Sequence, residues 1–151
     1  MLELHDTTEA EMREISGWKY AGDCAVYNLP PFEEQVRTGR GFANPKNRFR
    51  SCTDGGLLVG YFNLVEEAAA VRFGVGVRPD LCGRGYGQAI CRLACGLSRR
   101  LCPGKPVYLE VRTWNIRAIR CYEKAGFRVV GEPFQRTTPT GEGTFFRMAA
   151  G

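Results

Sequence analysis

The sequence predicts a single-domain α/β (α+β) protein with a mixed, mostly antiparallel central sheet that is flanked by helices. Three observations predict this fold class. The 151 residues are close to the usual size of one domain, and 44% of them are hydrophobic, which is enough for a buried core. Apolar residues recur with the period of a strand in some segments and of a helix in others. No repeat, linker or change in composition divides the chain, so we expect one domain over residues 1–151.

The N-terminal half of the chain is predicted to form four strands and one helix. Residues 2–5 alternate apolar and polar side chains, as in a strand, and Thr7 or Thr8 can cap a following helix that extends toward Trp18. Three consecutive strands of an antiparallel meander are predicted at residues 48–53, 56–65 and 70–78. The last of these strands leads into a loop rich in glycine.

Residues 20–47, between the first helix and the meander, are rich in Pro, Gly and aromatic side chains and show no sustained period. We expect a loop-rich segment that covers the core, with one or two helical turns over residues 31–36. The expected role of the aromatic side chains in this region is a hydrophobic lid over the core, with a substrate pocket as the alternative. These side chains are Trp18, Tyr20, Tyr27, Phe32 and Phe42.

The C-terminal half is predicted to alternate helices and strands. A helix with one apolar face follows Gly87 and ends before Pro103, and residues 107–112 alternate like a strand. Asn115 can cap a second helix, which ends at Gly126. Two closing strands are predicted at residues 127–134 and 144–148.

Charge and cysteine content exclude several classes of protein. The net charge of +5 suits an anionic ligand, but no basic run with interleaved aromatic residues supports a nucleic-acid binder. The seven cysteines are irregularly spaced and contain no C-x-x-C, so we expect reduced, mostly buried thiols and no metal site. Acidic residues stand where a signal peptide would be basic, and no apolar stretch is long enough to span a membrane, so we expect a cytoplasmic protein.

Three glycines at alternate positions, Gly83, Gly85 and Gly87, stand where the first of these C-terminal helices begins. Without side chains there, backbone N–H groups can point into one concavity at the helix N-terminus, where phosphate is the natural occupant. Arg84 adds a positive charge within the loop. A flexible turn is the alternative, and the glycines alone leave both interpretations open. The dinucleotide-binding and P-loop fingerprints are absent, because neither G-x-G-x-x-G nor G-K-[ST] occurs.

Two motifs, in the same order along the chain, resemble the GNAT superfamily of N-acetyltransferases. Residues 75–90, V-G-V-R-P-D-L-C-G-R-G-Y-G-Q-A-I, look like the loop that binds the pyrophosphate of acetyl-CoA in that superfamily. Residues 109–127, L-E-V-R-T-W-N-I-R-A-I-R-C-Y-E-K-A-G-F, are similar to its following strand and helix. The resemblance implies the GNAT fold and an acetyl-CoA-dependent N-acetyltransferase without a metal. Such an enzyme moves an acetyl group to a primary amine by direct transfer in a ternary complex.

The resemblance also implies which residues bind acetyl-CoA. The glycine loop would hold the pyrophosphate, backbone groups of residues 75–77 the pantetheine, and Asn115 would contact the pantetheine or orient its helix. Gly76 marks either a bulge that opens the strand edge or a close packing contact. Cys82 stands where the superfamily usually has Gln or Arg, so we expect cofactor affinity to be reduced at most, because backbone donors supply much of the binding. The expected cofactor-binding residues are Val75, Gly76, Val77, Cys82, Gly83, Arg84, Gly85, Tyr86, Gly87, Gln88, Asn115, Ala118 and Tyr122.

Two catalytic residues follow from the same resemblance. Tyr122 matches the tyrosine that donates a proton to the departing cofactor sulfur, with a core tyrosine as the alternative. Glu110 matches the general base of bacterial ribosomal-protein alanine N-acetyltransferases, which share the sequence L-E-V-R. A water molecule can relay or replace this base, and a solvated carboxylate or an ion pair with Arg112 is the alternative role for Glu110.

Positions on strands and helices support some of these assignments and exclude others. The alternation of residues 107–112 places Glu110 on the opposite face from Leu109 and Val111. His5 lies on the first strand, far from both motifs, and is expected to be structural. Cys121 is expected to point away from Tyr122 on their helix, which argues against a covalent acetyl-enzyme.

A non-catalytic acyl-CoA-binding or sensor module on the same fold is the alternative function, because Cys82 breaks the superfamily pattern. The presence of Glu110, Asn115 and Tyr122 favours the enzyme. The acceptor, a small-molecule or peptide amine, is not identified by any residue pattern. Neither a nucleic acid nor a membrane is expected as a partner, and the chain is expected to be a monomer or a homodimer.

Overall fold

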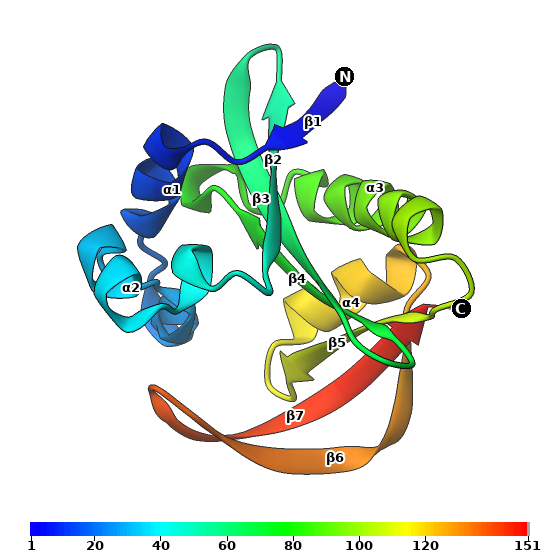
Figure 1. The fold of residues 1–151 in the computed structure, drawn as a ribbon. Coiled ribbons are helices and arrows are strands. Elements are labelled where there is room, and N and C mark those ends of the chain that lie inside the picture. The colour runs from blue at the N-terminus through cyan, green and yellow to red at the C-terminus, as the bar shows by residue number, and fades with distance from the viewer. Residues whose placement is uncertain (151) are drawn as a thin grey trace.

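Seven strands form one sheet in the order β1-β2-β3-β4-β5-β7-β6 in the computed structural model, which describes residues 1–150 (Figure 1). Adjacent strands run antiparallel except for β4 and β5, which run parallel. The predicted mixed, mostly antiparallel sheet is confirmed. The strands are β1 (Leu2–Asp6), β2 (Arg48–Asp54), β3 (Leu57–Glu66), β4 (Val71–Val77), β5 (Val107–Arg112), β6 (Arg128–Thr138) and β7 (Gly141–Ala150).

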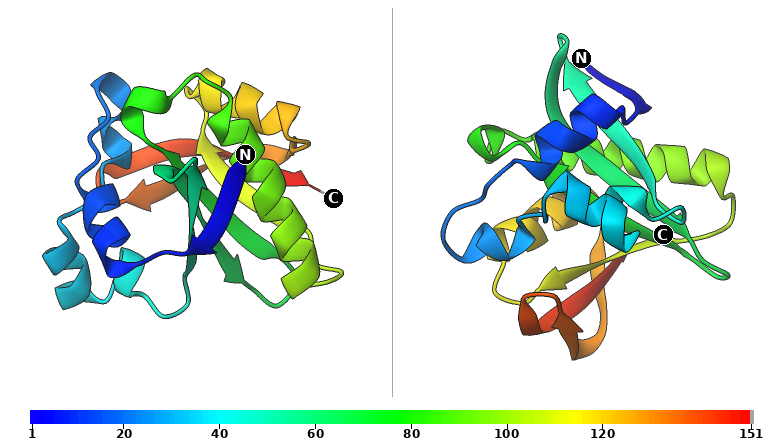
Figure 2. Two further views of the ribbon diagram at one scale, coloured as in Figure 1. Left: turned by 90° about the horizontal axis from the view of Figure 1, so that it is seen from above. Right: turned by 60° about the vertical axis from the view of Figure 1, so that its left-hand side comes forward.

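Helices flank this sheet on both sides, as predicted. Figures 1 and 2 show α1 and α2 on one side and α3 and α4 on the other. The α-helices are α1 (Glu9–Ser16), α2 (Phe32–Thr38), α3 (Tyr86–Leu101) and α4 (Ile116–Lys124). Shorter 3₁₀ helices are η1 (Gly22–Tyr27), η2 (Gly41–Ala43) and η3 (Pro79–Leu81).

The main core lies between the sheet and helices α3 and α4. Its largest fully buried side chains come from β3, α3, the α4–β6 junction and β7, and are Phe62, Ile90, Phe127 and Met148. Ile15, Trp18 and Leu58 form a second cluster beneath the N-terminal helices. All seven cysteines are free, and most of them are buried, as expected: Cys52, Cys91, Cys95 and Cys102.

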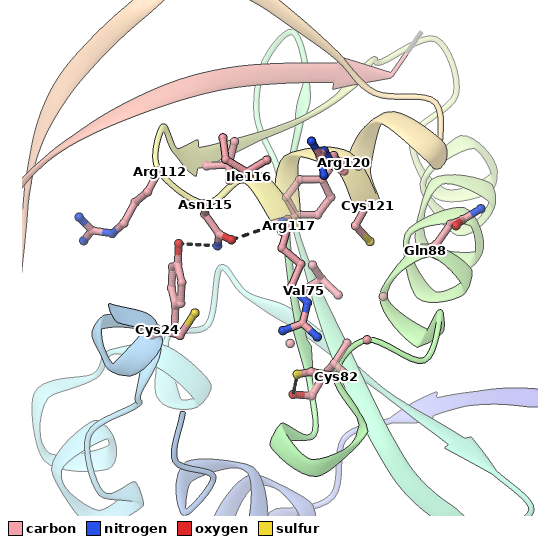
Figure 3. Close-up of a pocket in the computed structure, with 18 of the residues that line it drawn as sticks. Cys24, Val75, Cys82, Gln88, Arg112, Asn115, Ile116, Arg117, Arg120 and Cys121 are labelled. Carbon is pink, nitrogen blue, oxygen red and sulfur yellow. Dashed lines mark hydrogen bonds between the residues drawn. The ribbon is translucent and has the colours of Figure 1, made fainter. Parts of the chain in front are cut away.

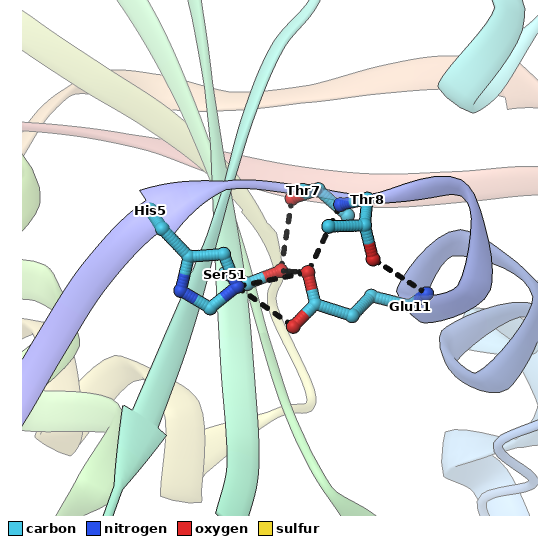
Figure 4. A network of polar contacts seen from close by, with 5 residues as sticks. All are labelled: His5, Thr7, Thr8, Glu11 and Ser51. Atoms are coloured by element: carbon cyan, nitrogen blue, oxygen red, sulfur yellow. Dashed lines mark hydrogen bonds and ion pairs between the residues drawn. The ribbon is translucent and has the colours of Figure 1, made fainter. Parts of the chain in front are cut away.

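Helix α1 begins at a capping box, with Thr8 as the cap. The Thr8 hydroxyl accepts a hydrogen bond from the Glu11 amide at 3.2 Å, and the Glu11 carboxylate accepts one from the Thr8 amide at 2.9 Å. The same carboxylate contacts the His5 ring on β1 at 2.7 Å and accepts a hydrogen bond from the Ser51 hydroxyl on β2 at 2.9 Å (Figure 4). His5 therefore joins β1 to α1, the structural role expected for it.

The strands β4 and β5 separate soon after they begin. Among the described residues, their paired positions are Val71 with Val107 and Arg72 with Tyr108. Both strands continue beyond these pairs, β4 to Val77 and β5 to Arg112. The sheet therefore opens between its two halves, and backbone groups along this edge of β4 are free of a neighbouring strand.

Two segments differ from the predicted elements. The closing strands are longer than predicted, because Gln135 to Thr138 pair with Gly141 to Thr144 across a tight turn. A register shift between Val130 and Phe134 accommodates Pro133, which an edge strand tolerates. Residues 20–47 contain η1 and η2 in addition to the predicted helical turns. The sequence did not predict these two elements, because short 3₁₀ helices carry no sustained apolar period.

Candidate active site

A pocket of about 740 Å³ lies where β4 and β5 separate. Its walls come from β4, β5, α4, the start of α3 and the η1 segment (Figure 3). Eleven of the expected cofactor-binding residues line it, namely Val75, Gly76, Val77, Cys82, Gly83, Gly85, Gly87, Gln88, Asn115, Ala118 and Tyr122. The pocket thus brings the two sequence motifs together around one cavity.

The glycine loop needs glycine for both conformation and space. Gly83 and Gly85 have φ angles of +82° and +86°, in the left-handed region that disfavours side chains. Gly85 is the N-cap of α3 and offers no side chain to its first turn, so the leading amides of this 16-residue helix have no side-chain cap. A Cβ on Gly87 would lie 3.1 Å from the Cys121 sulfur. This cradle of open amides at a helix N-terminus suits a phosphate group.

The positive charge beside the cradle comes from Arg117, a residue that the sequence analysis missed. A Cβ on Gly83 would lie 2.5 Å from the Arg117 guanidinium, which therefore extends from α4 to the loop (Figure 3). Arg117 lies four residues before Cys121, so the two side chains share one face of α4. This spacing could have identified Arg117 as a residue of the pocket.

Two expected cofactor-binding residues, Arg84 and Tyr86, do not line the pocket. Arg84 is exposed, and the Tyr86 hydroxyl donates a hydrogen bond to Asp54 at 2.7 Å, on the β2–β3 side of α3. The physical reason is the alternation of the loop, in which the glycines face the pocket and the intervening side chains face outward.

Cys82 lies at the edge of the cradle with its thiol turned toward backbone. Its sulfur lies 3.6 Å from the Arg78 carbonyl and 3.9 Å from the Val77 carbonyl. Partial burial raises the pKa of this thiol, although the nearby Arg117 guanidinium opposes the shift. A neutral thiol engaged with carbonyl oxygens supplies no charge to a phosphate, so the cradle depends on its amides and on Arg117.

Gly76 is explained by close packing. A Cβ at this position would overlap the ring of Tyr61 on the neighbouring strand β3. The register between β3 and β4 continues without a shift through Gly76, so the bulge interpretation was wrong. The neighbouring Val77 carbonyl accepts a hydrogen bond from the Tyr20 hydroxyl at 2.6 Å, which ties the N-terminal segment to the pocket wall.

Tyr122 both lines the pocket and packs against the main core, so its position fits the catalytic role and the core role that were both predicted for it. Its ring meets Phe127 edge to face, with centroids 6.1 Å apart. Burial raises the pKa of Tyr122 above its ordinary value. The phenol therefore stays protonated near neutral pH and can act as a hydrogen-bond or proton donor in the pocket.

Asn115 caps α4 as predicted and also contacts Tyr27 on the opposite wall of the pocket. Its side-chain oxygen accepts a hydrogen bond from the Ala118 amide at 3.3 Å, while its amide nitrogen donates one to the Tyr27 hydroxyl at 3.0 Å (Figure 3). Tyr27 belongs to η1, so this contact connects the cap of α4 to the loop-rich segment.

Glu110 lies on the predicted face of β5, opposite Leu109 and Val111 in the core, but it is not a free carboxylate. Its side chain is 4% exposed and accepts hydrogen bonds from Arg136 at 2.8 Å and from Arg72 and Arg147 at 3.3 Å. These arginines, from three other strands, take the place of the expected partner Arg112. Both carboxylate oxygens are therefore engaged in charge-assisted hydrogen bonds.

Cys121 lies on the other flank of α4 from Tyr122, as expected, but its side chain also lines the pocket. The pocket wraps around α4 widely enough to include Arg117 and Cys121 on one flank and Ala118 and Tyr122 on the other. The adjacent Cys91 thiol lowers the pKa of Cys121.

The aromatic side chains of the N-terminal segment divide between the two predicted roles. Tyr20 and Tyr27 line the pocket, together with Tyr61, which the sequence analysis did not single out. Trp18 and Phe42 pack in the second core cluster, and Phe32 is buried beneath the Arg13 guanidinium.

Two absences hold for residues 1–150. No group of three or more His, Cys, Asp or Glu side chains is arranged to hold a metal ion. No helix in this range combines the length and the apolar character needed to cross a membrane.

The chain is similar to known acetyltransferases in sequence. The model of the acetyltransferase (GNAT) family matches residues 10–127. N-alpha-acetyltransferase RimI of Mycobacterium tuberculosis is 36% identical over 97 residues, which are 61% of this chain and 59% of that protein. The match thus spans about three fifths of the length of this curated relative.

Solved structures share the fold over nearly the whole chain. The spermidine N-acetyltransferase of Vibrio cholerae, in complex with CoA and spermine, matches with a TM-score of 0.74 at 19% identity, over 98% of this chain and 94% of that chain. The ribosomal-protein-S18-alanine N-acetyltransferase of Escherichia coli matches with a TM-score of 0.70 at 19% identity, over 99% and 93%. With the family match covering most of the chain and the predicted sheet and loop in place, the chain belongs to the acetyltransferase (GNAT) family.

Proposed function

We propose that the protein is an acetyl-CoA-dependent N-acetyltransferase that moves an acetyl group to a primary amine by direct transfer in a ternary complex. The observation that carries this proposal is the continuity of one pocket from the glycine cradle of α3 to the opening between β4 and β5. The family match and the likeness to N-acetyltransferases support it.

The residues present suit acetyl-CoA. A Cβ at position 83 or 87 would crowd Arg117 or Cys121, and the uncapped amides of α3 suit a pyrophosphate. The free edge of β4 beyond Arg72 can pair with the pantetheine amides as an added strand would. When bound, acetyl-CoA supplies an activated thioester carbonyl.

Transfer requires that the amine lose a proton and that the departing thiolate gain one. Tyr122 is suited to the second task, because burial keeps its phenol protonated in the pocket. For the first task we assign a water molecule as the proton acceptor. The three arginine contacts of Glu110 support this choice over Glu110 itself, since both of its oxygens are already engaged.

The experiment follows thiol release from acetyl-CoA with a panel of primary amines, alongside calorimetric titration of CoA. We expect amine-dependent thiol release from the wild-type chain. Binding of CoA without thiol release for any amine would instead identify a non-catalytic acyl-CoA-binding module, the function that the departure at Cys82 favours. Failure to bind CoA at millimolar concentration would overturn both functions.

Replacement of Tyr122 by Phe tests the role of the phenol. The Tyr122→Phe variant should lose about 10²-fold in kcat, as expected when a general acid is removed, while its Kd for CoA changes little. Tyr108→Phe is the matched control, because Tyr108 lies outside the pocket lining and its hydroxyl contacts Glu67. Equal losses of kcat and CoA affinity in Tyr122→Phe would show that the tyrosine is structural.

A further inference from the structure

The face of the sheet opposite α3 and α4 carries an unusual concentration of arginine near the pocket. The register of β5 and β7 places Arg147 directly opposite Glu110 and Phe145 opposite Arg112. Arg72 reaches the same place from β4 and Arg136 from β6. We call Arg72, Arg112, Arg136 and Arg147, gathered around Glu110, the arginine cluster. Four guanidinium groups against one carboxylate leave a net charge of +3 (4 − 1).

Neighbouring side chains position the arginines of this cluster. The Arg147 guanidinium lies 4.4 Å from the centroid of the Tyr108 ring, and Arg136 lies 5.5 Å from that of Phe134. Arg112 lies 4.9 Å from the centroid of Phe145 and donates hydrogen bonds to the hydroxyls of Thr138 and Thr140. A guanidinium has five N–H donors, so one contact each with Glu110 leaves further donors on Arg72, Arg136 and Arg147.

These donors are accessible to a ligand. The side chains of Arg72, Arg136 and Arg147 are 46%, 43% and 47% exposed, whereas Glu110 between them is 4% exposed. The carboxylate at the centre is therefore covered, and the groups that face solvent are cationic. A further acid next to this cluster, Glu67, accepts a hydrogen bond from Tyr108 at 2.7 Å.

The arginine cluster is continuous with the pocket, because Glu110 and Arg112 line both. Among the described residues that line the pocket, Glu110 is the single acid, while Arg112, Arg117, Arg120 and Lys124 are basic. Arg117 lies at the glycine cradle, the proposed phosphate site, whereas Arg112 lies on β5, away from the cradle (Figure 3), and we place the acceptor at this side of the pocket.

This charge distribution discriminates between acceptors. A polyamine carries several ammonium groups and would need free carboxylates, but the one acid here is already neutralised by arginine. A carboxylate close to the reacting amine would instead find guanidinium donors suited to bidentate hydrogen bonds.

We propose that the arginine cluster selects an acceptor whose primary amine lies a few atoms from one or more carboxylates, as in an acidic amino acid or a peptide with an acidic N-terminal sequence. The inference rests on the proposed N-acetyltransferase function. It assigns the cluster to recognition of the acceptor and leaves the cofactor to the glycine cradle and Arg117.

The test compares kcat/KM, measured by thiol release, for matched acceptors. The panel consists of two peptides that begin with Ala-Glu-Glu or Ala-Lys-Lys and are otherwise identical, free glutamate, and spermidine. We expect the acidic peptide or glutamate to exceed the lysine peptide and spermidine by at least about 10-fold, with an advantage that decreases as salt rises. A higher value for glutamate than for the acidic peptide would assign the cluster to a small molecule, and the reverse to a protein N-terminus.

Variants test whether the preference for acidic acceptors depends on the arginine cluster. In Arg136→Gln/Arg147→Gln, the ratio of kcat/KM for the acidic acceptor to kcat/KM for a neutral peptide that begins with Ala-Ala should fall at least about 10-fold. Arg100→Gln, an exposed arginine in the last turn of α3, is the matched control and should leave both values unchanged.

The possible failures are distinguishable. Highest kcat/KM for spermidine or the lysine peptide would overturn the inference while the proposed function stands. No thiol release with any acceptor would overturn the proposed function itself. The wild-type panel decides between acidic and basic acceptors even if the double variant does not fold.

Discussion

The guanidinium group of Arg117 reaches the glycine loop from α4, whereas Arg84, which belongs to the loop itself, lies outside the pocket lining. A loop of alternating glycines exposes its backbone on one side, so the side chains between the glycines turn to the other side. At the scale of single residues, a positive side chain on the pocket side of this loop must therefore come from another element, here α4. The two arginines form a natural pair for a test.

The Arg117→Ala variant should weaken CoA binding by about 10-fold or more, because a charge-assisted hydrogen bond to an anion is lost. Arg84→Ala is the matched control, with the same change in net charge, and should weaken binding by less than about 2-fold. Calorimetric titration at two salt concentrations measures both. Equal weakening in the two variants would mean that the net charge of the region matters and the position of Arg117 does not.

At the scale of elements, the Glu11 carboxylate joins β1, α1 and β2 (Figure 4). Burial by itself would raise the pKa of Glu11, but hydrogen bonds from the Thr8 amide, His5 and Ser51 outweigh it and lower the pKa below its usual value of 4.5. A carboxyl group with a lower pKa in the folded chain contributes stability that is present above the unfolded pKa. That contribution is lost as the pH falls through the folded value.

Replacement of Glu11 by Gln should therefore destabilise the chain by about 1 kcal/mol at pH 7, the usual cost of a lost helix cap. The difference from wild type should shrink as the pH falls below 4.5, the usual pKa of the group. Urea unfolding at pH 7, 5 and 3.5 measures this dependence. Glu9→Gln, an exposed residue in the same helical turn, is the control and should change stability by less than about 0.5 kcal/mol at each pH. A gap between Glu11→Gln and wild type that stays constant with pH would contradict the assignment.

At the scale of the whole molecule, the strands, the glycine loop and the cap of α4 were predictable because each depends on local sequence. Alternation marks the meander, Thr8 and Asn115 cap their helices, and the two motifs contain the loop and Tyr122, which line one pocket. The remaining features depend on contacts between distant segments. The three arginines around Glu110 come from β4, β6 and β7, and no spacing in the sequence indicates that these strands meet there.

Packing explains the other differences between sequence and structure. Gly76 is required by the ring of Tyr61, fifteen positions away, so a single strand pattern could not separate a packing contact from a bulge. Cys121 lines the pocket because the cavity wraps around α4, which depends on the separation of β4 and β5. The active site is thus a product of how the two halves of the sheet diverge.

Phe127 connects the two halves of the sheet, and its truncation should lower the stability of the whole molecule. Its fully buried ring stacks on Phe73 of β4, with centroids 6.0 Å apart, and meets Tyr122 of α4. Phe127→Ala leaves a cavity between the two halves, so the free energy of unfolding should fall by about 3–5 kcal/mol, equivalent to a decrease in Tm of roughly 6–20 °C.

Thermal and urea unfolding measure this change. Val129→Ala, which truncates a 42% exposed side chain two residues along the chain, is the control and should change the free energy of unfolding by less than about 0.5 kcal/mol. Because Phe127 supports Tyr122, CoA-dependent stabilisation should persist in Phe127→Ala while kcat falls more than CoA affinity. A stability loss no larger than that of the control would show that the two halves of the sheet are held together elsewhere.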